Sequence, residues 1–234
     1  MRYLNAIGAD NTINIHTLNH DLFLESLCSA GFFGGNLSDG FTEFNSPYYG
    51  PLDYMKRTYL CRLEEYTGSY EGNFRLYKLH GSLDYGVYYK SEGTILTPEK
   101  YVKTKYGIGF SNLLKETQDS KGNISYERCW INYHADYMTG TTSKIERYQE
   151  PLLFKELFEH FKNNLKTADK LIIVGYGAKD SEVNKMIKEY FDYKTKPSFI
   201  IDPYAGETVL DFGKEIGARI IQKQLQVINE SDFK

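Results

Sequence analysis

The N-terminal third of the chain carries two segments in which apolar and polar residues alternate. Residues 12–19 and residues 74–79 both show this two-residue period, which predicts β-strands. Between them, apolar residues recur at helical spacing over residues 22–30, which predicts a helix with Asp21 as its N-cap. The sequence therefore opens with a strand, a sharp turn at residues 19–21 and a helix.

The C-terminal part of the chain alternates helix and strand more regularly. The spacing of apolar residues predicts a helix that begins near Pro151 and two further helices over residues 181–191 and 207–216. Short apolar runs predict strands at residues 171–174, 198–201 and 219–222. This alternation is typical of an α/β fold, in which a parallel sheet is covered by helices on both faces.

The middle of the chain is less regular. Residues 32–50 are rich in Gly, Asn, Ser and Phe, and they are predicted to form a loop. Residues 84–148 mix Tyr, Gly, Lys and Thr with short strand-like and helix-like pieces. We therefore expect one domain over residues 1–234, with an inserted subdomain at about 84–148.

Composition and charge argue against several classes of function. The net charge of −3 is unlike that of domains that neutralise many phosphates, so direct nucleic-acid binding is not expected. The apolar runs are too short to span a bilayer and no signal peptide is apparent, so a cytoplasmic protein is expected. Three widely spaced cysteines predict reduced thiols and no structural metal site. The 15% aromatic content favours wet clefts and contact surfaces as well as core.

Polar residues follow the ends of the predicted strands, and these are the candidates for a site. Ligands of parallel α/β sheets bind beyond the carboxyl ends of the strands, where the chain places Asn19, Asp21, His80, Gly175 to Gly177 and Asp202. An imidazole such as that of His80 exchanges protons near neutral pH, although it can equally bond a loop carbonyl. The amide of Asn19 can hold a water or a carboxamide, whereas Asp21 is as well explained as a helix cap.

The candidates in the C-terminal part suit the sugar and phosphate groups of a nucleotide. Gly175 and Gly177 would let a backbone approach a phosphate or ribose at a helix N-terminus. Asp202 can accept hydrogen bonds from ribose hydroxyls, or it can simply form a turn ahead of Pro203. The remaining histidines stand at no metal-ligand spacing and are expected to be structural, namely His16, His20, His134 and His160.

The motifs in these segments resemble those of the sirtuin-like family. Residues 17–21, T-L-N-H-D, are similar to the family's threonine-x-asparagine-x-aspartate motif. Residues 78–82, K-L-H-G-S, are similar to the motif that holds its catalytic histidine. Residues 171–177 with Asp180, and residues 200–203, resemble the strands and turns on the adenosine side of its cofactor. The resemblance runs from about residue 12 to the C-terminus, with residues 84–148 matching poorly.

The resemblance implies a Rossmann-like domain that binds NAD and breaks the bond between nicotinamide and ribose. Deacylating sirtuins use this step to deacylate lysine, whereas many bacterial sirtuin-like domains hydrolyse NAD, often in antiphage defence. Asn19 would position the attacking water or the ribose, Asp21 would hold the nicotinamide end, and His80 would be the general base. The other implied contacts to NAD or an ADP-ribose-type ligand are Thr17, Gly81, Gly175, Tyr176, Gly177, Asp180 and Asp202.

Two departures from the family pattern narrow this expectation. About sixteen residues precede Thr17, so the family's glycine-rich phosphate-binding segment is expected to be missing, supplied by another chain or lost by truncation. The cysteine-based zinc module is absent and Gly177 replaces the usual serine, which favours the bacterial NAD-hydrolase branch. Two alternatives stay open, a truncated or degenerate module without catalysis and an unrelated nucleotide-binding enzyme. A homo-oligomer or a partner domain also stays open.

Overall fold

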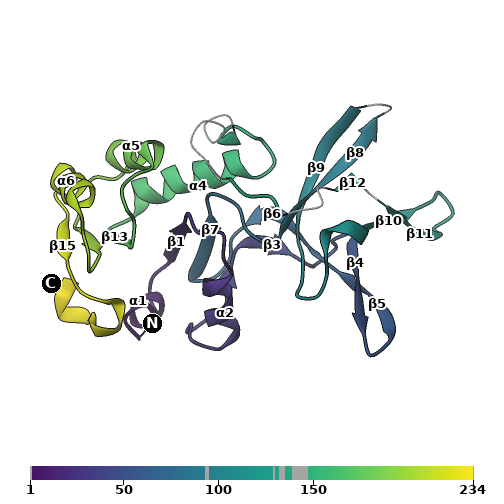
Figure 1. Cartoon of the computed structure of the whole chain (residues 1–234), viewed down its shortest axis with the longest axis horizontal. Coiled ribbons are helices and arrows are strands. Elements are labelled where there is room, and N and C mark those ends of the chain that lie inside the picture. The colour runs from purple at the N-terminus through teal and green to yellow at the C-terminus, as the bar shows by residue number, and fades with distance from the viewer. Residues whose placement is uncertain (1, 93–94, 129, 132–134, 139–146, 234) are drawn as a thin grey trace. The chain divides into compact units, whose positions relative to one another are not determined.

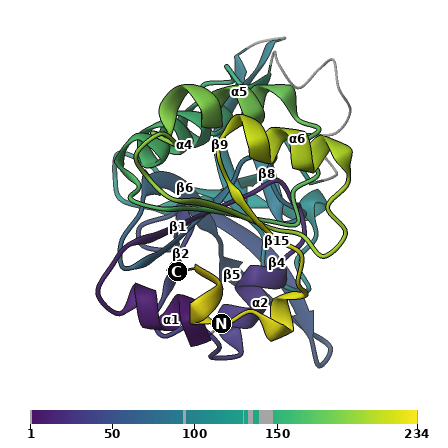
Figure 2. The ribbon, with the colours of Figure 1, turned by 90° about the vertical axis from the view of Figure 1, so that its left-hand side faces the viewer.

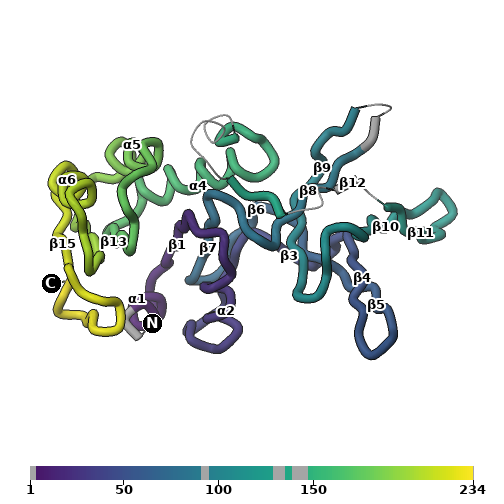
Figure 3. The backbone as a smooth tube through the Cα atoms, viewed as in Figure 1, coloured from purple at the N-terminus to yellow at the C-terminus, as the bar shows by residue number. Residues whose placement is uncertain are grey.

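The computed structural model describes residues 2–92, 95–128, 130–131, 135–138 and 147–233. The chain divides into two compact units, Met1–Phe158 and Glu159–Lys234. Figure 1 labels the helices and strands, and Figure 3 shows the path of the backbone through them.

A three-stranded parallel sheet with the order β1-β7-β2 lies at the start of the first unit. Its strands are β1 (Ile13–Thr17), β2 (Leu37–Ser38) and β7 (Phe74–Lys78). Two short helices, α1 (Arg2–Gly8) and α2 (Phe23–Ser29), precede and follow β1. The predicted strand–turn–helix unit is therefore confirmed, with strand ends one or two residues shorter than expected.

The two faces of this parallel sheet differ in chemistry. Because Ile15 pairs with Leu76 and Thr17 with Lys78, these side chains share the face that α2 contacts through Lys78. His16 lies on the other face, where its ring stacks on that of Tyr77 at a centroid distance of 4.5 Å. The expectation that His16 points away from the isoleucine row is confirmed.

Two antiparallel sheets make up the rest of the first unit. One has the order β11-β10-β4-β5 and consists of β4 (Tyr48–Tyr54), β5 (Arg57–Arg62), β10 (Leu114–Gln118) and β11 (Ile124–Arg128). The other has the order β12-β8-β9-β6-β3 and consists of β3 (Gly40–Thr42), β6 (Glu64–Ser69), β8 (Tyr85–Glu92), β9 (Ile95–Lys103) and β12 (Trp130–Ile131). A one-turn helix, η1 (Phe110–Asn112), precedes β10. Strands of both sheets contribute to a shared core of Tyr48, Leu63, Tyr88, Val102, Ile108 and Leu113.

The antiparallel strands correct the expected organisation of the middle of the chain. Residues 32–50 are not a loop, because they contain β2, β3 and the start of β4. The antiparallel strands begin at Gly40 and continue on both sides of β7, so residues 84–148 hold only part of them. The apolar pattern did not predict these strands because many of their buried residues are tyrosines. A tyrosine carries a polar hydroxyl, so a buried tyrosine does not stand out as apolar in the sequence.

The second unit contains another three-stranded parallel sheet, with the order β13-β14-β15. Its strands are β13 (Leu171–Val174), β14 (Ser198–Ile201) and β15 (Arg219–Ile221). The helices are α4 (Phe154–Thr167), which begins in the first unit, α5 (Ser181–Tyr190), α6 (Glu207–Glu215), η2 (Leu225–Val227) and η3 (Glu230–Phe233). Every strand and helix expected in this part is confirmed to within a few residues at its ends.

The sheet of the second unit has its two crossover helices on one side. Figure 2 shows α5 and α6 on the same side of the sheet, and Gly213 of α6 lies close to Ile200 and Ile220. On the other face, Phe199 packs edge-on against Phe233 of η3 at 5.3 Å between ring centroids. We expected helices on both faces of the sheet, but α5 and α6 lie on the same face. The other face is contacted by η3, through Phe233.

The structure as a whole is a mixed α/β fold that combines helices and two short parallel sheets with larger antiparallel sheets. A single parallel sheet, as predicted, is not what the described residues show, because most of their strands are paired antiparallel. Among the described residues, no helix has the length and apolar character needed to cross a membrane.

Candidate functional site

The first two sequence motifs meet at one edge of the parallel sheet of the first unit. β1 and β7 are adjacent, parallel and in register, with Thr17 opposite Lys78. The backbone N–H of Leu79 donates to Thr17 O at 2.9 Å, and the N–H of Leu83 donates to His20 O at 3.0 Å. The turn after β1 and the turn after β7 are therefore joined directly, as the order of the motifs predicted.

Lys78 connects the two turns through its side chain. Its ammonium group donates to Asp21 O at 2.5 Å, to Glu25 Oε1 at 2.8 Å and to Ser82 Oγ at 2.7 Å. The Lys78 side chain is 1% exposed, so all three donors of a buried charge are used within the protein. This lysine belongs to the K-L-H-G-S motif, yet sequence reasoning assigned it no role.

The network continues from Lys78 through Ser82 to Asp84. The Ser82 hydroxyl accepts from Lys78 and donates to the carboxylate of Asp84. Burial raises the pKa of Asp84, against the opposing influence of the Ser82 hydrogen bond and of the Lys103 and Lys78 charges. A carboxyl group with a raised pKa binds its proton more tightly in the folded chain than in the unfolded one.

The Asp84→Asn variant is expected to change how stability depends on pH. Since folding raises the pKa of Asp84, its contribution is fully present below the ordinary aspartate pKa of about 3.9 and is lost as pH rises through the folded value. The wild-type chain should therefore lose stability relative to Asp84→Asn as pH rises from about 3.5 toward neutrality. Urea unfolding of both proteins across this pH range measures the difference in unfolding free energy. A wild-type chain that becomes more stable relative to the variant as pH rises would contradict a raised pKa of Asp84.

The three predicted catalytic residues lie in very different surroundings. Asn19 is exposed, and its side-chain amide makes no hydrogen bond to the described residues. Asp21 Oδ1 accepts from Phe23 N at 3.0 Å, but the N-cap of α2 is Leu22 and not Asp21 as predicted, because the helix begins one residue later. His80 is only 4% exposed. Whether the Asn19 amide and the His80 imidazole open into one cleft stays a prediction.

Residues 135–138, the covering segment, lie across the turn that carries His80. Met138 N donates to His80 O at 2.7 Å, and Tyr137 forms an antiparallel bridge with Gly81. Asp136 holds this segment in place, since its carboxylate accepts two hydrogen bonds from Arg147, at 2.7 and 2.8 Å, and one from Tyr101 at 2.6 Å. Nothing in the sequence pattern of this region signalled its position beside the histidine.

Gly81 is explained by close packing beneath the covering segment. Its φ is +81°, a conformation that side chains rarely adopt, and an added Cβ would lie 2.5 Å from Asp136 O and 2.9 Å from Tyr137 Cα. The backbone can approach so closely only because residue 81 has no side chain. A contact between Gly81 and NAD stays a prediction.

The Gly81→Ala variant should lose about 3 kcal/mol or more of unfolding free energy, from left-handed strain together with the backbone clash. Gly175→Ala is the matched control, because Gly175 has a φ of +59° and an added Cβ there would meet no atom within 4 Å. We expect about 1–2 kcal/mol of strain for that control. Chemical denaturation of both variants gives the comparison, and equal losses would argue against the close packing at Gly81.

The ring of His20 lies near two other rings, the buried imidazole of His80 and the exposed ring of Tyr137. The ring centroids of His20 and His80 are 6.3 Å apart, and those of His20 and Tyr137 are 4.7 Å apart. Tyr137 is 37% exposed. From the sequence, His20 was expected to be structural and Tyr137 was not singled out. The sequence pattern does not show which aromatic side chains of a turn lie close together in the fold.

The predicted adenosine turn of the second unit is open to close approach. An added Cβ at Gly175 would meet nothing within 4 Å, and one at Gly177 would meet only Lys179 Cγ at 3.9 Å. Ala178 in the same turn has a φ of +53°, and Asn184 Nδ2 donates to its carbonyl at 2.8 Å. This turn leaves space beside its glycines, which is what a backbone contact to a phosphate or ribose requires.

Several other predicted contacts already have structural partners. Tyr176 Oη lies 2.8 Å from Asn184 Oδ1 and 3.0 Å from Asp180 O, and its one proton is directed to these two acceptors. Asp180 caps α5 by accepting from Val183 N at 3.2 Å. Asp202 Oδ1 accepts from Tyr204 N at 2.8 Å, which is the alternative turn role. In the first unit, Thr17 Oγ1 accepts from Asn19 N at 3.1 Å. Ligand contacts of these residues stay predictions.

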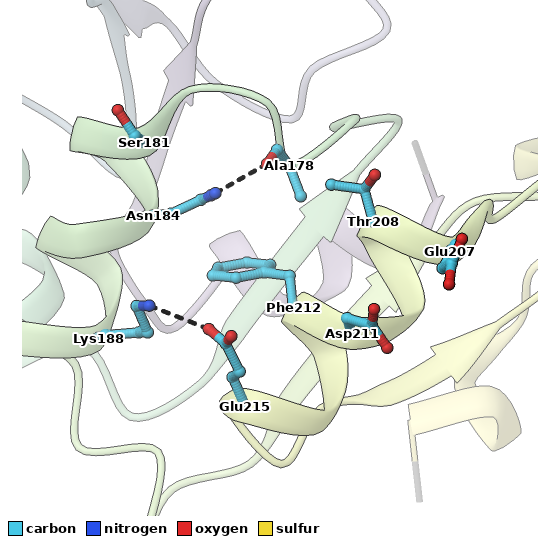
Figure 4. A pocket seen from close by; sticks show the side chains of 9 residues that line it. All are labelled: Ala178, Ser181, Asn184, Lys188, Glu207, Thr208, Asp211, Phe212 and Glu215. Carbon is cyan, nitrogen blue, oxygen red and sulfur yellow. Dashed lines mark hydrogen bonds and ion pairs between the residues drawn. The ribbon is translucent and has the colours of Figure 1, made fainter.

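A pocket of about 430 Å³ opens between α5 and α6 in the second unit. Figure 4 shows Phe212 between the two helices, with the Asn184 bond to Ala178 on one side and a Lys188–Glu215 ion pair of 2.9 Å on the other. None of the predicted site residues lines it. This pocket therefore lies beside the predicted adenosine turn, which contributes Ala178 to its lining.

Metal-ligand clusters and disulfides are absent from the part of the chain that the structure describes. No three His, Cys, Asp or Glu side chains gather there as a metal site would need. Cys28 and Cys61 are free thiols, while Cys129 and His134 lie outside the described residues. No protein-family model matches the chain, and no curated protein matches it either.

Proposed function

We propose that the chain is a sirtuin-like NAD hydrolase that cleaves the bond between nicotinamide and ribose. The observation that supports this is the register of β1 and β7, which brings the Asn19 turn and the His80 turn to the same sheet edge. The exposed Asn19 amide suits a group that must hold a water or a ribose. The finer fold assignment, a Rossmann-like sirtuin domain in a bacterial antiphage system, forms part of the proposal.

The proposed chemistry needs one nucleophile and one base. When the C–N bond breaks, its electron pair neutralises the pyridinium nitrogen, so nicotinamide leaves without needing a proton. Water held by Asn19 then forms the new C–O bond, and His80 takes the proton that this water loses. Because His80 is 4% exposed, side chains around its ring would have to move before water and substrate reach it.

The second unit enters the proposal through the resemblance and through its open turn. The resemblance implies that Gly175 and Gly177 contact the adenosine side of NAD, and the space beside both glycines is open. Asp202 would accept from the ribose, provided that its Oδ1 bond to Tyr204 leaves the other carboxylate oxygen available.

Incubation of the full chain with NAD, followed by chromatography of the products, tests the proposal. The expected products are nicotinamide and ADP-ribose in equal amounts. NAD recovered intact, under conditions in which the chain is shown to be folded by circular dichroism, would refute the hydrolase assignment.

A second candidate is a module that binds a nucleotide or a partner without turnover. The burial of His80 favours it, because a general base must reach its substrate. Calorimetry with NAD and with ADP-ribose separates the two candidates. Binding of both ligands without released nicotinamide would select the module over the enzyme.

A further inference from the structure

We propose that His20 relays the proton that His80 takes from water out to solvent. This inference rests on the proposed NAD hydrolysis and assigns a catalytic task to a residue that the sequence indicated as structural. Exposure increases over three neighbouring rings, from His80 at 4% through His20 at intermediate exposure to Tyr137 at 37%. His20 is thus a titratable group that lies near the buried imidazole and is more exposed than it is.

The proposed reaction creates the need for such a relay. Each turnover consumes one water and releases one proton, while the nicotinamide nitrogen keeps the electron pair of the broken bond. The proton therefore stays on His80 as an imidazolium until another group accepts it. A buried cation is costly, so the next turnover waits until this proton has left.

The geometry suits transfer between the two imidazoles. Their centroids lie 6.3 Å apart with a 35° angle between the rings, which is too far for stacking and within the span of two hydrogen bonds through one water. An imidazole has two nitrogens, so His20 can accept a proton on one side and release a proton from the other.

Backbone contacts fix the two histidines relative to each other. Leu83 N donates to His20 O at 3.0 Å, and the Ser82 hydroxyl lies 3.4 Å from the same oxygen. Lys78 donates to Asp21 O at 2.5 Å, one residue further along the same turn. The two rings therefore extend from turns that are tied together at the residues beside them, so their separation does not depend on a flexible loop.

Several charged groups lie on the turns that carry the two histidines. Lys78 brings one positive charge to the base of the turns, where it is paired with Glu25 at 2.8 Å. Asp84 lies beyond Ser82, and Asp21 is used at the start of α2. Tyr137 contributes a neutral ring from the covering segment. The pairing of Lys78 with Glu25 therefore leaves little net charge at the base of the turns.

Steady-state NAD hydrolysis by the His20→Phe variant tests the relay, because phenylalanine keeps a flat ring against Tyr137 and cannot carry a proton. We expect kcat to fall about tenfold or more while KM stays within about twofold. Added free imidazole should restore much of the lost kcat, since it can carry the proton in place of His20. His16→Phe is the matched control, because His16 also packs on a tyrosine, Tyr77, but lies on the other side of the sheet from Lys78.

Each outcome of this experiment decides the proposal. A His20→Phe variant as active as wild type, or one whose loss imidazole does not restore, overturns the relay while leaving NAD hydrolysis intact. If His20→Phe does not fold, His20→Gln serves with the same readouts. Wild-type protein that releases no nicotinamide refutes the proposed function itself, and the relay with it.

Discussion

The Lys78→Met variant is expected to lose about 3–5 kcal/mol of unfolding free energy, the range found when one partner of a buried ion pair is removed. The substitution keeps a long apolar stem but deletes an ammonium group that donates three hydrogen bonds. It leaves Glu25 with a carboxylate that is 18% exposed and has lost its cation. Chemical denaturation followed by circular dichroism measures the loss.

Two further variants show whether this loss comes from burial. Lys188→Met removes a lysine whose ion pair with Glu215 is largely exposed, so its cost should stay below about 1 kcal/mol. The double variant Lys78→Met with Glu25→Gln should recover part of the loss, because no uncompensated carboxylate then remains. If Lys78→Met lowers the unfolding free energy no more than Lys188→Met does, the hydrogen bonds of Lys78 do not hold the two turns together.

Replacement of either proposed catalytic residue is expected to abolish most NAD turnover. His80→Ala removes the general base and should lower kcat by about 10²–10⁴-fold. Asn19→Ala removes the group that positions the nucleophile, and we expect a loss of about a hundredfold. Because Asn19 is exposed and its side chain bonds none of the described residues, its replacement should leave stability nearly unchanged.

The buried position of His80 requires a careful control for that variant. His80→Gln keeps a polar side chain in the same place and separates loss of the base from loss of packing. Asn36→Ala, at another exposed asparagine of the first unit, is the control for Asn19. Full turnover in both Asn19→Ala and His80→Gln would exclude the proposed mechanism.

The parts of the fold that the sequence predicted are those with a simple apolar period. Residues 171–174 and 198–201 are continuous apolar runs, and both were located to the residue as β13 and β14. The helix that begins at Ser181 was equally clear, because Asp180 caps it through Val183 N. Local chemistry determines such elements, so no knowledge of distant contacts was needed.

The antiparallel strands could not be predicted in the same way. Their core contains Tyr48 and Tyr88, 3% and 0% exposed, whose rings pack at a centroid distance of 4.3 Å. Because tyrosine is partly polar, its position in a strand does not show which face of the strand is buried. The pairing partners also lie far apart in sequence, as β4 with β10 shows, and local pattern carries no information about them.

The sequence predicted which motifs contribute to the candidate site, but not how their side chains are arranged. Sequence order correctly brought the turn at Asn19 beside the turn at His80, because parallel neighbours share a carboxyl edge. It did not reveal that Lys78 joins the turns, that Tyr137 lies beside Gly81, or that His80 is buried. Those features depend on contacts with residues more than fifty positions away.

The central claim is that Asn19 and His80 belong to one NAD site. A ligand titration followed by NMR tests this claim most directly. NAD and the non-hydrolysable product ADP-ribose would be added to the folded chain labelled on asparagine amides and histidine rings. We predict that the side-chain signals of Asn19 and His80 shift together with one affinity, while those of Asn36 and His16 stay in place. Shifts at neither residue, or at the two with different affinities, would contradict a shared site.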